Sequence, residues 1–278
     1  MGNGHPVGGD GLSVRDSGIW AKEKLYYLEH YLDIFSVGMS KKWPGKLYYV
    51  DLFAGPGRCW IRETGEEIDG SPLIALKFNF SKYFFFESDP RCYEALEARV
   101  KVRAPEKLEK IRLIPGDCNR QISEVEPPGS SALGTAFIDP TGISQIAFKT
   151  IRQLTAHRKI DLIMNFPEGM GIRMNLHQYT DNEGTALDTF MGSAKWRDRF
   201  HTNITSFNQA CKQIAEEYLD NLRALDYQVV DGSQIPVKTA QNQLLYYLLF
   251  ASKDPKGNEF WRKIGLINPS GQREMFQC

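Results

Sequence analysis

Four acidic side chains, each following an apolar run, are the residues whose types and spacing suggest chemistry. They are Asp51, Glu87, Asp117 and Asp139. If each apolar run is a strand of an open α/β sheet, the four carboxylates lie at the carboxyl ends of the strands, where such sheets bind ligands. Carboxylates accept hydrogen bonds from hydroxyl and amino groups. The pattern therefore predicts a site for a polar small molecule.

The segment YYVDLFAGPGRC, residues 48–59, would supply the backbone of this site. Gly55 and Gly57 let the chain approach a ligand closely. Asp51 either contacts the ligand or holds the turn by accepting its amide protons, and the second role is favoured. Glu87 is expected to accept from ribose hydroxyls and Asp117 from an adenine amino group. An adenosine-type ligand is predicted, with contacts from Asp51, Phe53, Ala54, Gly55, Pro56, Gly57, Glu87, Ser88, Asp117, Cys118 and Asp139.

Two other nucleotide sites fit this segment less well. A dinucleotide fingerprint needs a third glycine and a helix that starts at once. Here Trp60 stands at the third position, and the next predicted helix starts at Ser71. A nucleotide-binding oxidoreductase is therefore disfavoured. A phosphate-binding loop of the GxxxxGK[ST] type is absent from the sequence.

Asp139, in the run FIDPTG, is the candidate catalytic residue. In a group-transfer reaction, the carboxylate of Asp139 would face the transferred group. It would orient an acceptor amine or hydroxyl, or take up its proton. The competing interpretation is that Asp139 caps a helix starting at Pro140. Asn165 and Glu168 follow the fifth strand and are expected at the same mouth. Substrate contacts are predicted for Arg58, Pro140, Thr141 and Arg173.

Strands and helices alternate along the chain. Two late strands, at 227–230 and 244–252, would form an antiparallel edge pair. The helix at residue 71 is expected to use Ser71 as its N-cap. The alternation predicts a Rossmann-like α/β fold, with a mostly parallel seven-stranded sheet and helices on both faces. The other predicted strands are 46–53, 83–89, 110–117, 134–142 and 159–169, and the helices are 19–39, 71–80, 90–101, 147–157 and 207–225.

Three segments have a predicted organisation of their own. Residues 1–18 are rich in glycine and lack the apolar stretch of a secretory signal, so a flexible tail is expected. Residues 19–278 would form a single domain. Residues 168–204 are polar and long for a connection, which predicts a lid or a substrate loop. The aromatic run 83–86 is expected to point to alternate faces of a buried strand.

Composition limits the partners. The chain has 278 residues, with 34 acidic and 34 basic side chains. Any contact with nucleic acid must therefore come from a local patch rather than from net charge. The five cysteines include no CxxC pair, so neither a disulfide framework nor a zinc site is favoured, and a reduced, cytoplasmic location is expected. No apolar run reaches the roughly 20 residues that span a bilayer, and no membrane association is expected.

The sequence also resembles a known family. The blocks YYVDLFAGPGRC, IDGSPLIAL, YFFFESDP, FIDPTG, LDTFMGSAKWRD and LLYYLLFASKDP are similar to the three-Cys-motif partner family, TcmP, over about residues 20–264. The resemblance implies a class I methyltransferase fold, S-adenosylmethionine as cofactor, and a separate cysteine-motif partner similar to radical S-adenosylmethionine enzymes. Related sequences often have an aromatic residue where this chain has Thr141, so a base-stacking role is not implied there.

Two functions remain open at this point. The first is transfer of a methyl group from S-adenosylmethionine to a nitrogen or oxygen atom, with nucleic acid as the favoured substrate. The second is a partner protein that keeps the cofactor fold but serves as scaffold or adaptor without methylating anything. The sequence alone does not identify the acceptor atom.

Overall fold

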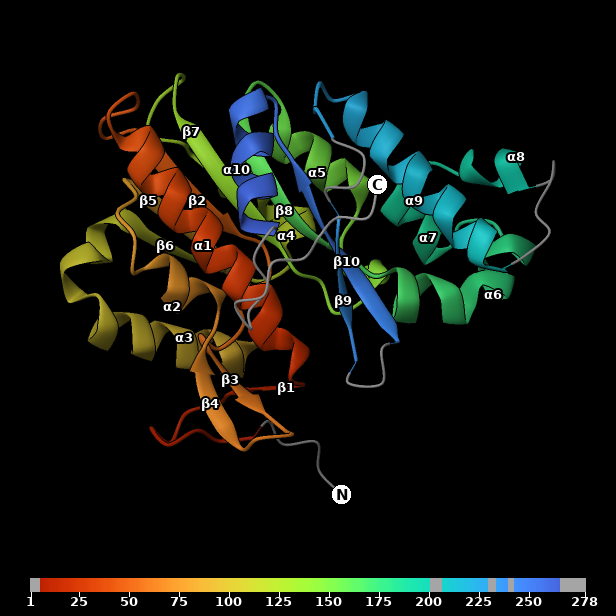
Figure 1. Cartoon of the computed structure of the whole chain (residues 1–278). Helices are drawn as coiled ribbons and strands as arrows, with labels where there is room; N and C mark the ends of the chain where they lie inside the picture. Colours follow the sequence, from red (N-terminus) through yellow and green to blue (C-terminus); the bar gives the residue numbers. More distant parts are fainter. Residues whose placement is uncertain (1–5, 201–206, 230–233, 240–242, 266–278) are drawn as a thin grey trace.

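A seven-stranded sheet forms the centre of the protein in the computed structural model, which describes residues 6–200, 207–229, 234–239 and 243–265 (Figure 1). The strand order is β6-β5-β2-β7-β8-β10-β9. The five strands from β6 to β8 pair in parallel, whereas β10 is antiparallel to both of its neighbours. The strands are β2 (Leu47–Asp51), β5 (Lys82–Glu87), β6 (Ile111–Pro115), β7 (Leu133–Ile138), β8 (Lys159–Phe166), β9 (Ile235–Lys238) and β10 (Leu244–Ala251). The predicted Rossmann-like sheet is confirmed.

Helices cover both faces of this sheet (Figure 1). One face packs against α1 (Trp20–Ser40), α2 (Ser71–Ala75), α3 (Pro90–Arg103) and α10 (Pro255–Gly265). The other packs against α4 (Cys118–Gln121), α5 (Phe148–Thr155) and α9 (Phe207–Arg223). Short 3-10 turns, η1 (Pro105–Lys110), η2 (Ile122–Glu124) and η3 (Ile143–Gln145), complete the connections.

The aromatic run in β5 shows how one strand serves both layers. Tyr83 and Phe85 belong to the apolar cluster under α1, while Phe84 and Phe86 belong to the cluster on the opposite face. Side chains of a strand alternate between its faces, so both faces can be apolar only when both are covered. The predicted buried strand is confirmed.

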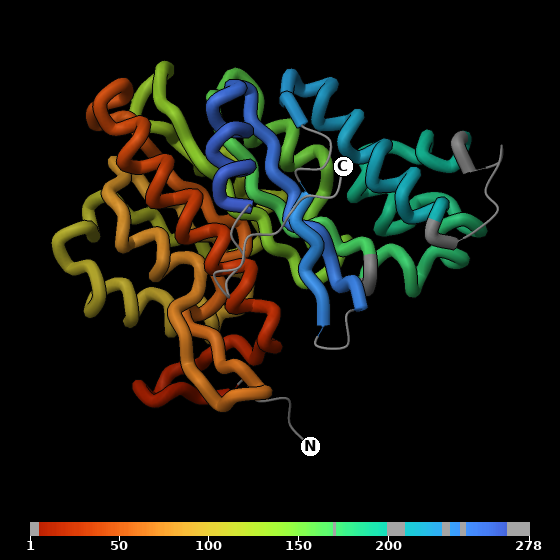
Figure 2. The backbone as a smooth tube through the Cα atoms, in the orientation of Figure 1, coloured from red at the N-terminus to blue at the C-terminus, as the bar shows by residue number. Residues whose placement is uncertain are grey.

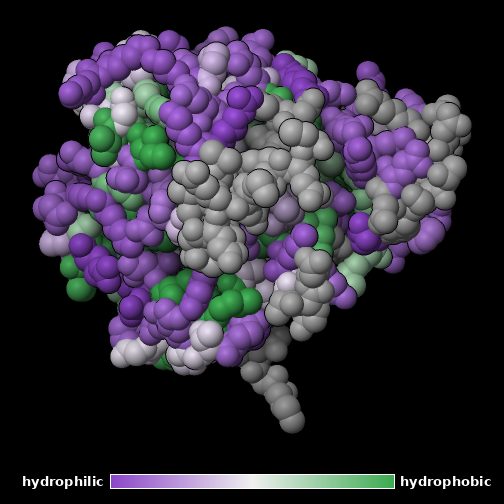
Figure 3. All heavy atoms as spheres, viewed as in Figure 1, coloured by the Kyte–Doolittle hydropathy of each residue, from purple (hydrophilic) through white to green (hydrophobic). Residues whose placement is uncertain are grey.

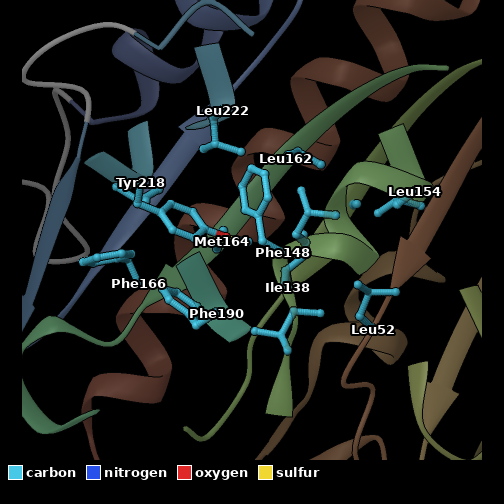
Figure 4. Packing of buried hydrophobic residues seen from close by; sticks show 14 of the residues in the cluster. Leu52, Ile138, Phe148, Leu154, Leu162, Met164, Phe166, Phe190, Tyr218 and Leu222 are labelled. Carbon is cyan, nitrogen blue, oxygen red and sulfur yellow. The ribbon is translucent and has the colours of Figure 1, made fainter. Parts of the chain in front are cut away.

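Aromatic side chains also fill the space between β8 and the helices of the second face. Figure 4 shows Phe148 of α5, Phe166 of β8 and Tyr218 of α9 converging there. The ring centroid of Tyr218 lies 5.6 Å from that of Phe148 and 5.4 Å from that of Phe166. This packing fixes the end of β8 where the site begins.

The residues before α1 differ from the predicted tail. Residues 15–17 form β1 (Arg15–Ser17), which pairs in parallel with β3 (Arg58–Ile61), and β3 pairs with β4 (Glu66–Asp69). The small sheet β1-β3-β4 lies at the bottom of the view in Figure 1, and Figure 2 traces the N-terminal segment running beside the hairpin. The backbone pairing of β1 with β3 holds this segment against the hairpin.

Two other local predictions need correction. Helix α2 starts at Ser71 with Gly70 as its N-cap and without a side-chain cap, because the Ser71 hydroxyl bonds Asp51 instead. The predicted strand 227–230 forms only an isolated bridge from Gln228 to Ser252, and Val230 lies outside the described residues. The edge strand is β9, where Pro236 is tolerated because an edge strand needs fewer backbone donors.

Residues 168–204 are helical where the structure describes them, rather than irregular. They contain the π-helical turn η4 (Glu168–Ile172), η5 (Arg173–Asn175), α6 (Leu176–Asp181), α7 (Ala186–Met191) and α8 (Trp196–Phe200). Thr185 and Asp188 form a reciprocal capping box at the start of α7. Trp196, only 2% exposed, donates to Asp188, as expected of a core anchor.

The face of the molecule in Figure 3 is mainly hydrophilic, with apolar residues in small separate patches. Within the described ranges, no helix has the length and apolar character needed to cross a bilayer.

Candidate active site

The order in which the chain adds strands reverses between β2 and β7, and the candidate site lies at this point. After β2 the chain adds β5 and β6 on one side, then crosses to β7 and β8 on the other. Open α/β sheets bind ligands in the crevice outside the carboxyl ends of the strands at such a switch. Asp51 ends β2, and Asp139 follows β7 directly.

The turn after β2 has the geometry expected of a close-approach loop. Asp51 accepts a hydrogen bond from the backbone N–H of Phe53 at 3.1 Å, in agreement with the predicted turn-holding role. Gly55 and Gly57 adopt φ values of 65° and 87°, which residues with a side chain rarely adopt. The Gly70 N–H donates to the Gly57 carbonyl at 2.7 Å, so the end of the β3–β4 hairpin closes back on the turn.

Asp51 itself is fully buried, and its electrostatics follow from that position. Burial raises its pKa to about 7, and the charge of Asp139 acts in the same direction. Hydrogen bonds from Ser71, from the Phe53 N–H and from Tyr49 oppose the rise because they stabilise the carboxylate. The turn is therefore held by a carboxyl group that is partly protonated near neutral pH.

A cavity of about 610 Å³, here called the Glu87 cavity, brings together five of the eleven predicted cofactor contacts. The Glu87 side chain is 7% exposed, and its Oε1 accepts from the Asp89 N–H at 2.7 Å. Among the described residues no hydrogen bond reaches the other oxygen, Oε2. The predicted residues that line this cavity are Phe53, Glu87, Ser88, Asp117, Cys118 and Thr141.

Asp117 and Cys118 have additional structural roles in this cavity. Asp117 caps α4 by accepting from the Asn119 N–H at 2.9 Å, and the Asn119 side chain donates to the same oxygen at 2.8 Å. No hydrogen bond from the described part of the chain reaches its second oxygen, Oδ2. Burial raises the pKa of Cys118 to about 12, which disfavours a thiolate and indicates that this side chain packs against the cavity wall.

A second cavity, of about 510 Å³ and here called the Asp139 cavity, lies beside the first. Asp139 Oδ2 is ion-paired with Lys24 of α1, and Oδ1 accepts from Asn165 Nδ2 at 3.0 Å. The Asp139 and Lys24 side chains are each 13% exposed. No helix begins at Pro140, because the next turn, η3, starts at Ile143, so the helix-cap interpretation of Asp139 is wrong.

Two buried polar atoms on residues lining the Asp139 cavity lack a partner among the described residues. They are Asn165 Oδ1 and the Tyr246 hydroxyl, on side chains that are each 7% exposed. Buried polar groups are normally hydrogen-bonded, so such atoms commonly indicate a missing partner. Trp20 and Tyr179 add aromatic surface to the same walls.

The two cavities meet, and a narrow space along the turn joins them. This space, about 30 Å³ and here called the turn gap, is lined by the turn residues Phe53, Ala54, Gly55, Pro56 and Gly57, together with Arg58, Lys24 and Asp139. Arg15 lines the Glu87 cavity, the Asp139 cavity and the turn gap. Sequence reasoning missed Arg15 and Lys24, because both lie in the segment before the first strand.

Two of the predicted site residues lie elsewhere. Glu168 is buried beside Arg173, with 3.9 Å between Oε1 and Nη2, and neither lines the two cavities. Burial raises the pKa of Glu168, and Arg173 opposes the rise. The π-helical turn that starts at Glu168 directs this pair toward Cys211 and Tyr247, whose pKa values both respond to it. Asn165, Pro140 and Thr141 do line the Asp139 cavity, as predicted.

Comparison with known proteins supports the fold. No family model matches the chain, and no curated protein matches it. A solved structure from Legionella pneumophila, assigned to the family DUF519, is 12% identical, with a TM-score of 0.52 over 91% of this chain and 96% of that chain. This likeness shows the fold alone.

Two further structures show weaker similarity. M. jannaschii TYW2 in complex with AdoMet is 12% identical, with a TM-score of 0.42 over 84% of this chain and 76% of that chain. The O-methyltransferase TomG from Streptomyces achromogenes, in complex with SAM, is 8% identical, with a TM-score of 0.45 over 83% and 80%. Neither score reaches 0.5, so the functional argument rests on the geometry of this chain.

Proposed function

We propose that the chain is an S-adenosylmethionine-dependent methyltransferase. The observation that carries the proposal is the junction of the Glu87 and Asp139 cavities at the switch point, with Arg15, Thr141 and Ser144 lining both. A group-transfer enzyme needs this arrangement, because donor and acceptor must be held within reach of each other while water is excluded.

The residues of the Glu87 cavity fit the proposed cofactor. Glu87 Oε2 is free to accept from ribose hydroxyls, and Asp117 Oδ2 from the adenine amino group. The turn with Gly55 and Gly57 presents backbone without side chains, which suits the methionyl portion. When bound, S-adenosylmethionine supplies an electrophilic methyl group whose bond to sulfur breaks as the bond to the acceptor forms.

Asp139 is the proposed catalytic group of the acceptor side. Its Oδ1 is oriented by Asn165 and its Oδ2 by Lys24. A carboxylate held in this way can orient an acceptor N–H or O–H and take up its proton as the methyl group arrives. Before the transfer, the ammonium group of Lys24 stabilises the ionised carboxylate of Asp139.

A nucleic acid is the proposed substrate class. The Asp139 cavity combines Trp20, Tyr179 and Tyr246 with the cation Arg62, whose side chain is 46% exposed. Aromatic side chains stack on bases and cations contact phosphates, and together they form the usual surface for single-stranded nucleic acid. Trp20 and Tyr246 supply the aromatic surface that Thr141 does not. The unpartnered Asn165 Oδ1 and Tyr246 hydroxyl would satisfy polar groups of the base.

The resemblance to the three-Cys-motif partner family adds a partner to the proposal. It implies a separate cysteine-motif protein, similar to radical S-adenosylmethionine enzymes, that acts together with this chain. Co-purification of the two proteins would test this part independently of catalysis.

Calorimetric titration with S-adenosylhomocysteine tests cofactor binding. We expect Glu87→Ala to weaken binding about tenfold to hundredfold, because hydrogen bonds to a charged group contribute about 1.5–3 kcal/mol. Glu94→Ala, an exposed acid on α3, is the matched control and should bind like the wild type. Absence of binding by the wild type at millimolar ligand would refute the proposal.

Label transfer from S-adenosylmethionine to RNA, DNA and protein tests the reaction. Asp139→Asn should keep cofactor binding and lose transfer at least tenfold. The adaptor alternative predicts no transfer to any of the three, and a partner-dependent activity that survives both Asp139→Asn and Glu87→Ala.

A further inference from the structure

The segment before α1 pairs with the β3–β4 hairpin, and its residues Arg15 and Asp16 line both the Glu87 cavity and the Asp139 cavity. This N-terminal strap, residues 6–17, contains an antiparallel bridge between Val7 and Ser13. Its last three residues pair with β3 as β1, and the N–H of Arg62 donates to the Ser17 carbonyl at 3.0 Å. The strap is therefore part of the folded body rather than an appendage.

A buried arginine ties the strap to the turn after β2. Arg99 of α3 is 4% exposed, and its Nε and Nη2 each donate to Asp10 at 2.8 Å. Its Nη1 donates at 2.6 Å both to the Ser13 carbonyl in the strap and to the Pro56 carbonyl in the turn. The hydrogen bond from Arg99 lowers the pKa of Asp10 to about 2. A buried guanidinium is costly unless its donors are satisfied, so Arg99 favours the position in which strap and turn are together.

This arrangement holds the guanidinium of Arg15 over the turn. Arg15 Nε lies 3.3 Å from the position a Cβ would have on Gly55, and Cζ and Nη2 lie 3.7 Å from it. Among the described residues the Arg15 side chain has no hydrogen bond or ion pair. Its neighbour Asp16 is paired with Arg62 at 3.2 Å and so does not neutralise it.

Arg15 is also the described cation at the turn gap that has no carboxylate partner. The other two described cations that line the gap already have carboxylate partners: Lys24 is paired with Asp139, and Arg58 lies 2.9 Å from Glu67. A guanidinium with free donors binds a carboxylate in a bidentate manner, which an ammonium group cannot do.

We propose that Arg15 binds the carboxylate of the methionyl group, so that the N-terminal strap is a wall of the cofactor site and Arg99 is its positioning residue. The inference rests on the proposed function. With the ribose at Glu87, the methionyl chain extends from β5 toward the turn after β2, and its carboxylate meets the guanidinium over Gly55. The strap thereby confers selectivity for ligands that carry an amino-acid tail.

The competing interpretation is that Arg15 blocks the gap. The space at the turn is only about 30 Å³, and the guanidinium lies directly over Gly55. A blocking side chain and a ligand-binding side chain predict opposite results when it is removed.

Two ligands that differ in the amino-acid tail distinguish these cases. S-adenosylhomocysteine carries the carboxylate, whereas 5′-methylthioadenosine has the same nucleoside and sulfur without it. We expect Arg15→Ala to lower the affinity for S-adenosylhomocysteine about tenfold to hundredfold in calorimetry. The affinity for methylthioadenosine should change by no more than about twofold. Arg15→Lys should restore part of the loss. Arg91→Ala, an exposed arginine on α3, removes the same charge outside the cavities and should change neither affinity.

Asp10→Ala tests the positioning role of Arg99. This substitution removes the carboxylate partner of Arg99 on the strap. It should weaken the binding of S-adenosylhomocysteine but not that of methylthioadenosine, and by less than Arg15→Ala does. A general loss of folding would instead weaken both ligands and lower the melting temperature.

Three outcomes would overturn the inference. If Arg15→Ala leaves the ratio of the two affinities unchanged, Arg15 does not bind the carboxylate. If Arg15→Ala tightens the binding of S-adenosylhomocysteine, the Arg15 side chain blocks the turn gap. If the wild-type protein binds neither ligand, the proposed function fails as well, whereas wild-type binding with an inert Arg15→Ala refutes only this inference.

Discussion

The buried carboxyl of Asp51 leads to a prediction about stability and pH. Burial raises its pKa from 3.8 to about 7. Between pH 3.8 and about pH 7, Asp51 keeps its proton in the folded protein, whereas the same carboxyl group in the unfolded chain has released it. Stability therefore falls as pH rises through this window and becomes independent of Asp51 above it. From pH 5 to pH 8 the loss is about 3 kcal/mol, at about 1.36 kcal/mol per pH unit up to pH 7.

Asp51→Asn removes this contribution while its amide oxygen can still accept from the Phe53 N–H. Urea unfolding at pH 5 and pH 8 should therefore show a smaller decline in stability for the variant than for the wild type, by about 3 kcal/mol. Asp161→Asn provides a graded comparison, because burial raises the pKa of Asp161 to about 6, and Tyr31 donates to it at 2.6 Å. The decline in stability of Asp161→Asn should differ from that of the wild type by about 1 kcal/mol.

Equal declines in the wild type and Asp51→Asn would refute the reasoning, because they would mean that Asp51 is ionised in the folded protein at pH 5. A difference of the opposite sign would mean that hydrogen bonds to the carboxylate outweigh its burial.

Two further predictions concern the same region. Gly57→Ala should lower the free energy of unfolding by about 1–2 kcal/mol, since φ is 87° there and the new Cβ would lie 3.2 Å from Leu96. Gly142→Ala, where nothing lies within 4 Å and φ is −164°, should change it by less than about 0.5 kcal/mol in the same urea assay, and equal losses would contradict the account. Lys24→Met should cost about 1–3 kcal/mol at pH 7 because Asp139 loses its ammonium partner, and an unchanged urea midpoint would show that the pair adds nothing.

The sequence predicts the sheet and half of the site for a physical reason. Apolar runs that end in Asp51, Glu87 and Asp139 carry both the strand signal and the chemistry, and parallel strands bring those ends to one edge. Glu168 was assigned by the same logic and is wrongly placed, because the π-helical turn after Pro167 directs it away from the cavity. The sequence contains no strong local signal for that turn.

Arg15 and Lys24 were missed for a different reason. Lys24 reads as the polar face of an amphipathic helix, and only the packing of α1 against the sheet brings it to Asp139. For Arg15, a weak signal was present in the alternation of Leu12, Ser13, Val14 and Arg15, which is typical of a short strand. The surrounding glycines favoured a flexible segment, and the buried contact with Arg99 depends on a residue far along the chain.

The Asp10–Arg99 pair has a practical consequence for anyone who shortens this protein. By composition the first 17 residues would be the natural ones to trim before expression. A chain that starts at Gly18 would keep the seven-stranded sheet but would leave the Arg99 guanidinium without its carboxylate and the turn after β2 without one wall. A loss of cofactor binding by such a product would reflect the missing strap, and it would not show that the full chain lacks a cofactor site.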